Sequence, residues 1–585
     1  MHEKIFTQLM EVAQGQGLQP QDAMSVVLQL LCWRALSRTP GTLPDELSFE
    51  SAGKQSAQGL RDLLPQLQQL KPQLFQDDRA WRQLREPRAL LERIQQLESQ
   101  GLMANLNLDD AAFWAADRPT DYPAMAPGLA DFLLHLLQIQ PGQHIYVPWE
   151  NSGQIAARVA RSSGAVWGEA MQPGCVAELL ALTGAENWSL HLGDPVKTPL
   201  ALEGGKLRTF DAAVCFSQMG LRYLPEVCDW DLFGRFPEKG VVGSVLQIRH
   251  LLAQTRGRIV IAVSNSVLFA SGSERQLREH LLSLGYVQAV ISLPKGLCTH
   301  AAIPVSVLIL DNTQRAERVR FVDATADEFI EVKQRKRTDL IELDRLLQLV
   351  NGHEDCDTAV SATLDDIAAN DFSLQVNRYV LSESARQLQA SLARYPLRKL
   401  GDFFEVIRPR QHATASTGVA VSELQVSDLP QYGYITQASK GSLFDLDSQK
   451  SELYFLQRGD VLVTFKGAIG KVGIVGDCPE PGEGGWLAGQ TQAVLRCRKP
   501  QLFPPESLVV YLHSGLGQSL LASQVVGASV ATIKLSDLTK LLIPLPDPAE
   551  LQRMAECFHQ QNQIEQEIQQ LRAKQAEIAA AFWAL

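Results

Sequence analysis

The spacing of apolar positions changes along the chain, and these changes divide it into regions. Residues 1–115 carry apolar side chains three to four positions apart, with glutamine and charge between them, as in LRDLLPQLQQL and RALLERIQQLESQ. This period is typical of amphipathic α-helices. The first region is therefore predicted to be an N-terminal helical domain, with packing and partner contact as its expected role.

Residues 116–330 alternate short apolar runs with amphipathic stretches. The runs HIYVP, GAVWGEA, FDAAVCF, GRIVIAVS, VQAVISLP and PVSVLILD are predicted strands, and LADFLLHLLQIQ, SVLQIRHLLAQ and ERQLREHLLSLG are predicted helices. Strands separated by helices predict an α/β fold with a doubly wound, mostly parallel sheet. Ligands of such sheets bind at the carboxyl ends of the strands.

Three further regions follow. Residues 331–396 are charged and irregular, and are expected to form a connector with some helix. Residues 397–545 are richer in glycine, and pieces such as DVLVTF and KVGIVGD predict a compact β-rich domain. Residues 546–585 are expected to form one long C-terminal helix with a short coiled-coil stripe. That stripe pairs two copies of the chain or packs within one, and its residues are Ile564, Ile568, Leu571, Ile578, Phe582 and Leu585.

Composition narrows the class of protein. The chain of 585 residues is 45% hydrophobic and 20% charged, as in ordinary soluble proteins. It has no apolar run of about 18 residues, so no membrane span is predicted, and its polar N-terminus does not resemble a signal peptide. The nine cysteines form no CxxC pair. No metal site is predicted, and the expected location is a reducing cytoplasm.

Charge is unevenly distributed. The net charge is −11, but residues 397–545 hold 14 Lys/Arg and 13 Asp/Glu, a balance of +1. The rest of the chain therefore carries −12. A nucleic-acid-binding protein needs a local basic face rather than an overall positive charge. The distribution permits DNA binding in the C-terminal third.

Six segments in the middle of the chain occur in the order of a known family. They are FDAAVCFSQMG, SNSVLFASGSERQLREHLL, AVISLPKGL, IPVSVLILD, RFVDATADEF and LDDIAANDFSLQVNRYV. With them, residues from about 116 to 380 resemble the modification (M) subunit of type I restriction–modification systems, an adenine-N6 DNA methyltransferase. The resemblance implies a Rossmann-like methyltransferase domain.

The C-terminal third shows a second resemblance. LRKLGDFFEVI, RGDVLVTFKGAIGKVGIVGD and GASVATIKLSDLTKLLIPLPDPAELQRM resemble half of the specificity (S) subunit of the same systems. Residues 397–545 would then be one target-recognition domain, followed by the helix of 546–585. An S subunit carries two such domains and reads a split target, so a single domain implies one half-site.

The base-holding loop departs from the M-subunit pattern. In that family the loop reads FDxxxxNPPF or NPPY, where Asn and the first Pro accept hydrogen bonds from the flipped adenine and the aromatic residue stacks on it. The corresponding residues here are Phe216, Ser217, Gln218 and Met219. Phe216 has no acceptor, and only proline fixes φ in such a loop. Extruding a base costs a few kcal/mol, and little in this loop offsets that cost.

The cofactor loop is altered as well. The family pattern DPxCGSGG lets S-adenosylmethionine approach the backbone, whereas this chain has VPWENSGQ at 147–154. Val147 replaces the acidic residue, and Trp149 is one of three residues that replace smaller ones. Bulky side chains block the close approach that glycine allows. The residues kept from the pattern are Pro148, Ser152 and Gly153.

Two acids are candidates for the rest of a cofactor site. Glu169 lies one position away from where an acid would bind the ribose hydroxyls, and Asp194 stands where the family has an acid near the adenine. A surface or capping role is the alternative for both. Because two sites are altered on a retained scaffold, we interpret the chain as a pseudo-methyltransferase with no catalytic residues and no cofactor. The alternative is a divergent active adenine-N6 methyltransferase that uses S-adenosylmethionine.

A target-recognition domain reads base edges while basic side chains contact phosphate. The predicted partner is double-stranded DNA, together with a second copy of the chain or other proteins of a restriction-modification-like or phage-defence system. A scaffold that binds protein is the third hypothesis. The candidate DNA-binding residues are Arg408, Arg410, Lys440, Lys466, Lys471, Gln490, Thr491 and Lys534.

Overall fold

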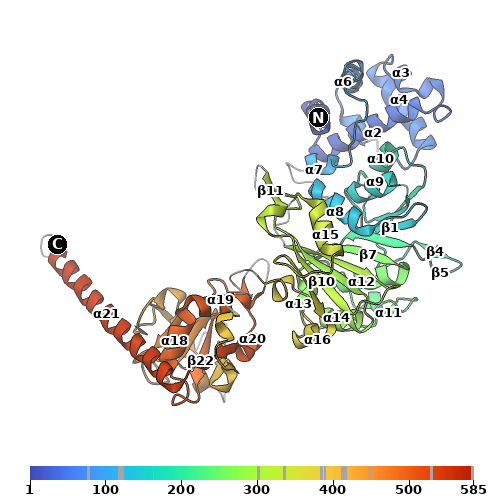
Figure 1. Ribbon diagram of the computed structural model, residues 1–585. Coiled ribbons are helices and arrows are strands. Elements are labelled where there is room, and N and C mark those ends of the chain that lie inside the picture. The colour runs from blue at the N-terminus through green and yellow to red at the C-terminus, as the bar shows by residue number, and fades with distance from the viewer. Residues whose placement is uncertain are drawn as a thin grey trace. The chain divides into compact units, whose positions relative to one another are not determined.

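The chain forms two compact units, Met1–Val380 and Leu381–Leu585, called here the N-terminal and C-terminal units (Figure 1). The computed structural model describes residues 1–75, 79–115, 124–162, 164–172, 174–299, 304–333, 337–381, 387, 390–409, 418–446, 451–526 and 531–580.

Helices occupy the start of the N-terminal unit. Helix α2 is buried along most of its length because apolar residues lie on several of its faces, and its Trp33 Nε1 donates to the Leu47 carbonyl at 2.7 Å. One apolar core runs from these helices into the following sheet, so they are not separated from it. The helices are α1 (His2–Gly15), α2 (Pro20–Arg38), α3 (Phe49–Ala52), α4 (Ala57–Leu70), α5 (Arg79–Gln83), α6 (Pro87–Ser99) and α7 (Ala111–Ala115).

A nine-stranded sheet forms the centre of the N-terminal unit, and the coarse prediction of an α/β fold with a parallel-rich sheet is confirmed. β3, β2, β1, β6 and β7 run parallel, β9 lies antiparallel between β7 and β8, and β10 pairs parallel with β8. In spatial order the strands are β13 (Ala359–Thr363), β10 (Arg318–Asp323), β8 (Val287–Ser292), β9 (Val305–Asp311), β7 (Arg258–Ser264), β6 (Ala212–Phe216), β1 (His144–Pro148), β2 (Ala165–Ala170) and β3 (Trp188–Leu192).

Helices cover both faces of this sheet (Figure 1). Alternate strand residues face opposite sides, so Val147 joins the core with α8 (Pro127–Leu137), α9 (Gln154–Arg161) and α10 (Val176–Leu182), while Tyr146 joins the core with α12 (Gly243–Gln254) and α14 (Ser273–Ser283). The shorter elements are β4 (Leu202–Glu203), β5 (Lys206–Leu207), α11 (Glu226–Asp229) and α13 (Ser266–Phe269).

Residues 331–380, part of the region 331–396 expected to form a connector with some helix, form helices and strands of the N-terminal unit. β13 pairs antiparallel with β10 at the sheet edge, and α15 (Leu343–Asn351) packs on α8. The hairpin of β11 (Ile330–Lys333) and β12 (Arg337–Leu340) precedes them, and α16 (Leu364–Ala369) starts with a capping box of Thr363 and Asp366. An edge strand has one partner and a half-exposed face, so AVSAT carries little of the apolar signal of a buried strand.

The C-terminal unit is built on two sheets with helices beside them. The first sheet has the order β15 (Phe404–Ile407), β22 (Gln492–Cys497), β19 (Val461–Thr464), β20 (Val472–Val475) and β17 (Tyr434–Ile435). The second has β18 (Lys440–Phe444), β16 (Val419–Leu424) and β21 (Trp486–Ala488). The remaining elements are β14 (Leu397–Lys399), β25 (Leu542–Pro544), β23 (Val525–Val526), β24 (Thr532–Ile533), α18 (Pro505–His513), α19 (Gly515–Ser523), α20 (Leu535–Lys540) and α21 (Pro548–Ala580).

Helix α21 begins in the core of the C-terminal unit and then leaves it. Leu551 and Phe558 are buried in the core that α18 shares, whereas Ile564, Ile568, Leu571 and Ile578 of the predicted stripe are exposed. Phe582 and Leu585 lie outside the described residues. Within the described ranges, no helix combines the length and apolarity needed to cross a lipid bilayer.

Candidate functional site

The carboxyl end of β1 leads into a loop that is filled by its own side chains. Among its residues, Pro148 and Ser152 line one small cavity with Phe216 and Gln218 from the loop after β6. This cavity has a volume of about 20 Å³, which is room for roughly one water molecule. The predicted cofactor and base residues are thus brought together, but around almost no open space.

Glu150 occupies the start of α9. Its carboxylate accepts hydrogen bonds from the backbone N–H groups of Ser152 (3.0 Å), Gly153 (2.8 Å), Ile155 (3.1 Å) and Ala156 (3.1 Å), and from the Ser152 hydroxyl (3.1 Å). The side chain is 5% exposed. Free N–H groups at a helix start are a ready site for an anion. Here the chain supplies that anion itself.

Trp149 closes the same loop from the other side of the sheet. It has φ of 56°, in the left-handed region, and is 2% exposed. A bulky residue in this conformation costs on the order of 1–3 kcal/mol, which the burial of a tryptophan offsets. Its ring lies against His250, with ring centres 5.8 Å apart. The position that needed a small residue therefore holds a packed aromatic ring.

S-adenosylmethionine does not fit this arrangement. Ligand pockets usually enclose about 300–1,000 Å³, far more than the 20 Å³ found here. Val147 is fully buried in the apolar core and offers no acceptor for the cofactor amine. Gly153, at φ 78°, packs so closely on Leu179 that a Cβ would come within 2.6 Å of its Cδ1. This glycine serves the packing of α9 on α10.

Glu169 is occupied by a buried hydrogen-bond chain. Arg235 donates to His250 Nδ1 at 2.7 Å, which leaves His250 Nε2–H to donate to the Tyr146 oxygen at 2.7 Å, and Tyr146 donates to Glu169 at 3.0 Å. Burial raises the pKa of Glu169, and burial together with the Arg235 charge lowers the pKa of His250 well below its usual value. The carboxylate is fully buried, so it presents no free oxygen to a ribose.

Arg235 holds this chain in place from the segment after the base loop. It forms a buried ion pair with Asp231 at 2.8 Å, in which both side chains are 2% exposed. It also donates to the carbonyls of Pro195 and Val196 at 2.9 and 2.8 Å. No sequence motif marked these residues, because the bonds from Arg235 to Pro195 and Val196 join segments about 40 positions apart.

Asp194 stabilises a turn. Its Oδ1 accepts from the Val196 N–H and the Tyr223 hydroxyl, both at 3.1 Å, just after β3. Asp194 does not line the small cavity. This is the local role that the sequence left open as the alternative to adenine contact.

The base loop itself packs inward. Phe216 and Met219 are partly buried against the core that contains α8 and α9. Ser217 is 2% exposed and its N–H donates to the Ala262 carbonyl at 3.0 Å, while its hydroxyl has no partner among the described residues. The loop therefore presents neither an acceptor pair nor a free aromatic face to a base.

Several candidate DNA-binding residues of the C-terminal unit meet around the turn between β19 and β20. The Phe465 N–H donates to the Thr491 carbonyl, and the Ile533 N–H donates to the Phe465 carbonyl. These bonds bring Lys466, Gln490–Thr491 and the segment of Lys534 together. Lys466 and Gln490 are exposed, and Thr491 and Lys534 are half-buried. The Gly467 N–H already donates to Ala531, so it is not available to phosphate.

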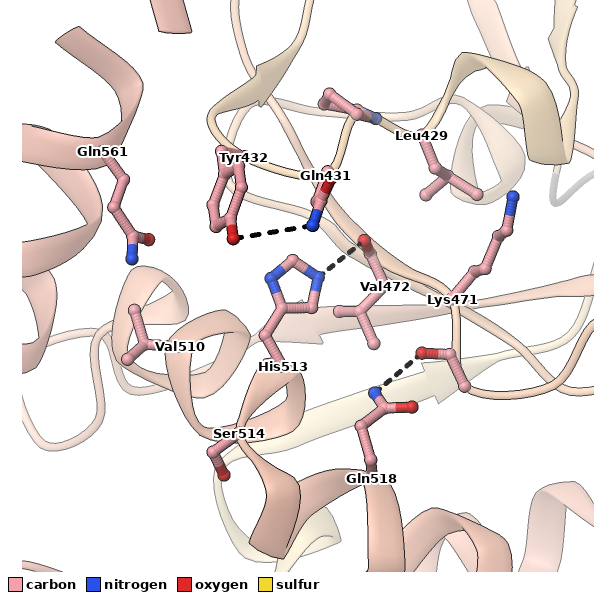
Figure 2. Close-up of a pocket in the computed structure, with 12 residues that line it drawn as sticks. Leu429, Gln431, Tyr432, Lys471, Val472, Val510, His513, Ser514, Gln518 and Gln561 are labelled. Atoms are coloured by element: carbon pink, nitrogen blue, oxygen red, sulfur yellow. Dashed lines mark hydrogen bonds between the residues drawn. The ribbon is translucent and has the colours of Figure 1, made fainter. Parts of the chain in front are cut away.

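The other candidates lie elsewhere in the C-terminal unit. Lys440 forms an ion pair with Glu423 at 3.0 Å on the second sheet. Arg408 is exposed after β15, and Arg410 lies outside the described residues. Lys471 lines a pocket of about 640 Å³ with residues of α18, α19 and α21 (Figure 2). Sequence reasoning missed its other lining residues, because they come from four separate segments without a motif.

No group of histidine, cysteine, aspartate and glutamate side chains in the described ranges could hold a metal ion.

Residues 243–387 match the N-6 DNA Methylase family. This match begins after both the cofactor loop and the base loop. It therefore covers part of the scaffold and neither altered site.

Two curated relatives are methylase subunits of type I restriction enzymes. The chain is 28% identical over 151 residues to the methylase subunit of the type I restriction enzyme MpnII of Mycoplasma pneumoniae, covering 26% of this chain and 27% of that protein. It is 25% identical over 139 residues to the MjaVII methylase subunit of Methanocaldococcus jannaschii, covering 23% and 24%. The matched part thus spans about a quarter of each relative.

Among solved structures, a type I restriction-modification methyltransferase subunit from Streptococcus thermophilus has a TM-score of 0.55 at 17% identity, covering 65% of this chain and 99% of that one. A modification subunit of a putative type I restriction enzyme from Vibrio vulnificus has 0.51 at 13%, covering 62% and 93%. These likenesses show the fold alone. The comparisons support the predicted resemblance to type I methylase subunits, while the S-subunit half stays a prediction.

Proposed function

We propose that the protein is a sequence-specific DNA-binding pseudo-methyltransferase of a restriction-modification-like or phage-defence system, which recognises DNA and recruits or regulates partner proteins. The observation that carries this proposal is the self-filled loop after β1. Five donors bond to Glu150, Trp149 is buried, and the cavity beside them measures about 20 Å³.

Opening this loop for a cofactor would be costly. The Glu150 carboxylate would have to leave several buried N–H groups, and each buried donor left without a partner costs about 1–3 kcal/mol. Trp149 would have to give up its packing on His250. The base loop adds a second obstacle, because Phe216 and Met219 pack into the core rather than facing outward.

The C-terminal unit supplies the DNA-reading part of the proposal. Lys466 and Gln490 are exposed on neighbouring segments. Lysine suits phosphate contacts that fix register, and glutamine suits hydrogen bonds to an adenine edge. Their proximity gives one surface both kinds of contact.

Pairing of two chains through α21 belongs to the same proposal. Its exposed stripe of Ile564, Ile568 and Leu571 has the spacing of a coiled-coil seam. Two copies would join two half-sites into one symmetric target. Replacing Ile564 and Leu571 with aspartate should turn a dimer into a monomer in light scattering after gel filtration. A wild-type monomer at micromolar concentration would contradict the pairing.

An active adenine-N6 methyltransferase is the second candidate, and the family match of residues 243–387 agrees equally with both because it covers neither altered loop. One experiment separates the two candidates. The full chain is incubated with random-sequence duplex and S-adenosylmethionine, and the retained DNA is sequenced for both motif and modified bases.

An enriched motif with unmodified adenines is the expected result. The same motif carrying methyladenine would overturn the pseudoenzyme and establish the second candidate. Retained DNA without any motif would contradict sequence-specific recognition. The Lys466→Gln variant with Gln490→Ala is the control, and it should retain less DNA.

A further inference from the structure

The pocket of the C-terminal unit lies outside the features on which the proposed function rests. Its volume is about 640 Å³. Four segments line it: 429–432 before β17, 470–472 at the start of β20, the junction of α18 and α19, and Gln561 on α21 (Figure 2). All belong to the same compact unit.

His513 presents an acceptor to this pocket. Its Nε2–H donates to the Val472 carbonyl at 3.1 Å. With the proton on Nε2, the lone pair of Nδ1 can accept a hydrogen bond. In Figure 2 the second ring nitrogen points away from Val472, toward the side of Tyr432 and Gln561.

Amide groups and an aromatic ring surround that nitrogen. The Gln431 Nε2 lies 3.5 Å from the Tyr432 hydroxyl, a long contact that leaves both groups free for better partners. The Gln561 side chain makes no hydrogen bond within the described part of the chain, and it reaches toward the pocket from α21 (Figure 2). Tyr432 is 43% exposed, so its ring is accessible.

Lys471 provides a positive charge at the rim. It is exposed and forms no ion pair with another described residue. Gly470 before it has φ of 87°, and a Cβ there would come within 2.6 Å of Gln518 Oε1. The glycine lets the chain turn tightly here, and Gln518 secures the turn by donating to the Gly470 carbonyl at 2.9 Å.

We propose that this pocket holds one nucleotide, with the base inside and the phosphate at the rim. Tyr432 would stack on the base, since aromatic side chains serve as stacking platforms for bases. Gln431 and Gln561 would bond to the base edge, as glutamine does with adenine. Lys471 would bind the phosphate. The volume falls within the range of about 300–1,000 Å³ usual for ligand pockets.

The acceptor on His513 selects among bases. Adenine and cytosine can donate to it from an exocyclic amine, whereas thymine can donate only from its ring N3–H, where the two flanking carbonyl oxygens repel the lone pair of His513. The nucleotide has two possible sources with the same chemistry: a free mononucleotide, or a base extruded from bound duplex. The second source rests on the proposed DNA-binding function.

Two measurements on the full chain test the proposal. Calorimetric titration with AMP, CMP, TMP and inorganic phosphate reports on a free nucleotide. The fluorescence of duplex containing 2-aminopurine in place of adenine reports on extrusion, because it rises when the base leaves the stack. We expect binding of AMP and CMP at least tenfold tighter than of TMP, or a fluorescence rise on duplex binding.

Variants tie either signal to the pocket. Tyr432→Ala should weaken binding at least tenfold, whereas Tyr432→Phe keeps the stacking ring and should stay within about twofold. Lys471→Gln should weaken binding several-fold. The matched control Lys499→Gln, an exposed lysine outside the pocket, should change nothing. A thermal melt of each variant checks folding.

The outcomes separate this inference from the proposed function. Duplex binding without nucleotide binding and without a fluorescence rise overturns the pocket and leaves the DNA-binding proposal standing. Nucleotide binding without duplex binding supports the pocket and contradicts that proposal. A signal that survives both Tyr432→Ala and Lys471→Gln, or equal competition by inorganic phosphate, overturns the pocket as a nucleotide site.

Discussion

The loop after β1 and the pocket of the C-terminal unit are both lined by polar groups. They differ in whether these groups are hydrogen-bonded within the chain or face an open space. In the loop, four backbone N–H groups around the start of α9 donate to Glu150, beside a cavity of about 20 Å³. In the pocket, the Gln561 amide and one nitrogen of His513 face a space of about 640 Å³. The comparison shows that a site can lose its room for a ligand when a side chain of the protein itself takes up the hydrogen-bonding groups of that site. This can happen even where the surrounding fold is retained.

The largest expected effect tests how firmly the closed region is built. Arg235→Ala would leave Asp231 buried without its partner and His250 Nδ1 without its donor. Removing one partner of a buried ion pair costs about 3–5 kcal/mol. Urea denaturation should show a loss of this size. Arg88→Ala, which breaks an exposed pair with Glu92, should cost less than about 1 kcal/mol. Equal losses would contradict a special role for Arg235.

A second buried carboxylate beside the closed region predicts a pH dependence. Burial raises the pKa of Glu178 on α10 to about 8, and hydrogen bonds from its own backbone N–H and from Gln29 only partly oppose this rise. The folded protein keeps the proton that the unfolded chain releases near pH 4.5. The contribution of Glu178 to the free energy of unfolding is therefore fully favourable below pH 4.5, and it is lost as the pH rises toward 8.

Glu178→Gln removes this titration. Relative to wild type it should be stabilised by about 4 kcal/mol more at pH 8.5 than at pH 4.5. Thermal melts across this pH range measure the difference. A gain that is the same at every pH would show that packing, and not ionisation, distinguishes the two side chains.

The next prediction compares the two regions directly. Glu150→Ala removes an acceptor shared by five donors. It should cost about 2 kcal/mol, less than the sum over the bonds, because water can enter the vacated space and accept from N–H groups at a helix start. Tyr432→Ala, in the open pocket, should cost less than about 0.5 kcal/mol. Glu150→Ala should still not bind S-adenosylmethionine in calorimetry, because Val147 and Trp149 remain. Micromolar binding by this variant would mean that Glu150 alone closes the loop.

The smallest expected effect concerns DNA. Lys466→Gln should lower duplex affinity a few-fold and reduce the slope of log affinity against log salt by about 1, the loss expected for one phosphate contact. Fluorescence anisotropy at several salt concentrations measures this slope. Lys499→Gln should leave it unchanged. An unchanged slope for Lys466→Gln would place the phosphate contacts elsewhere.

The sequence predicted the parts of the fold that depend on continuous burial. Strands such as Arg258–Ser264 and Val305–Asp311 are apolar runs because both faces are covered. It missed β13, whose edge position leaves AVSAT half polar. It predicted that VPWENSGQ is no cofactor loop, but not that Glu150 fills it, although an acid a few residues before a helix start is a local signal for capping. The sequence did not predict the residues that line the pocket, because they come from four segments that are distant along the chain.

The Glu150 carboxylate acts as a ligand that is permanently attached to its own site. A free molecule that seeks the same N–H groups binds only during the fraction of time in which this carboxylate is absent, and its apparent affinity falls by that fraction. If opening costs about 4 kcal/mol, the fraction is roughly one in a thousand. A cofactor with an intrinsic micromolar affinity would then need millimolar concentrations. Glu150 therefore acts as an intramolecular competitor for these N–H groups.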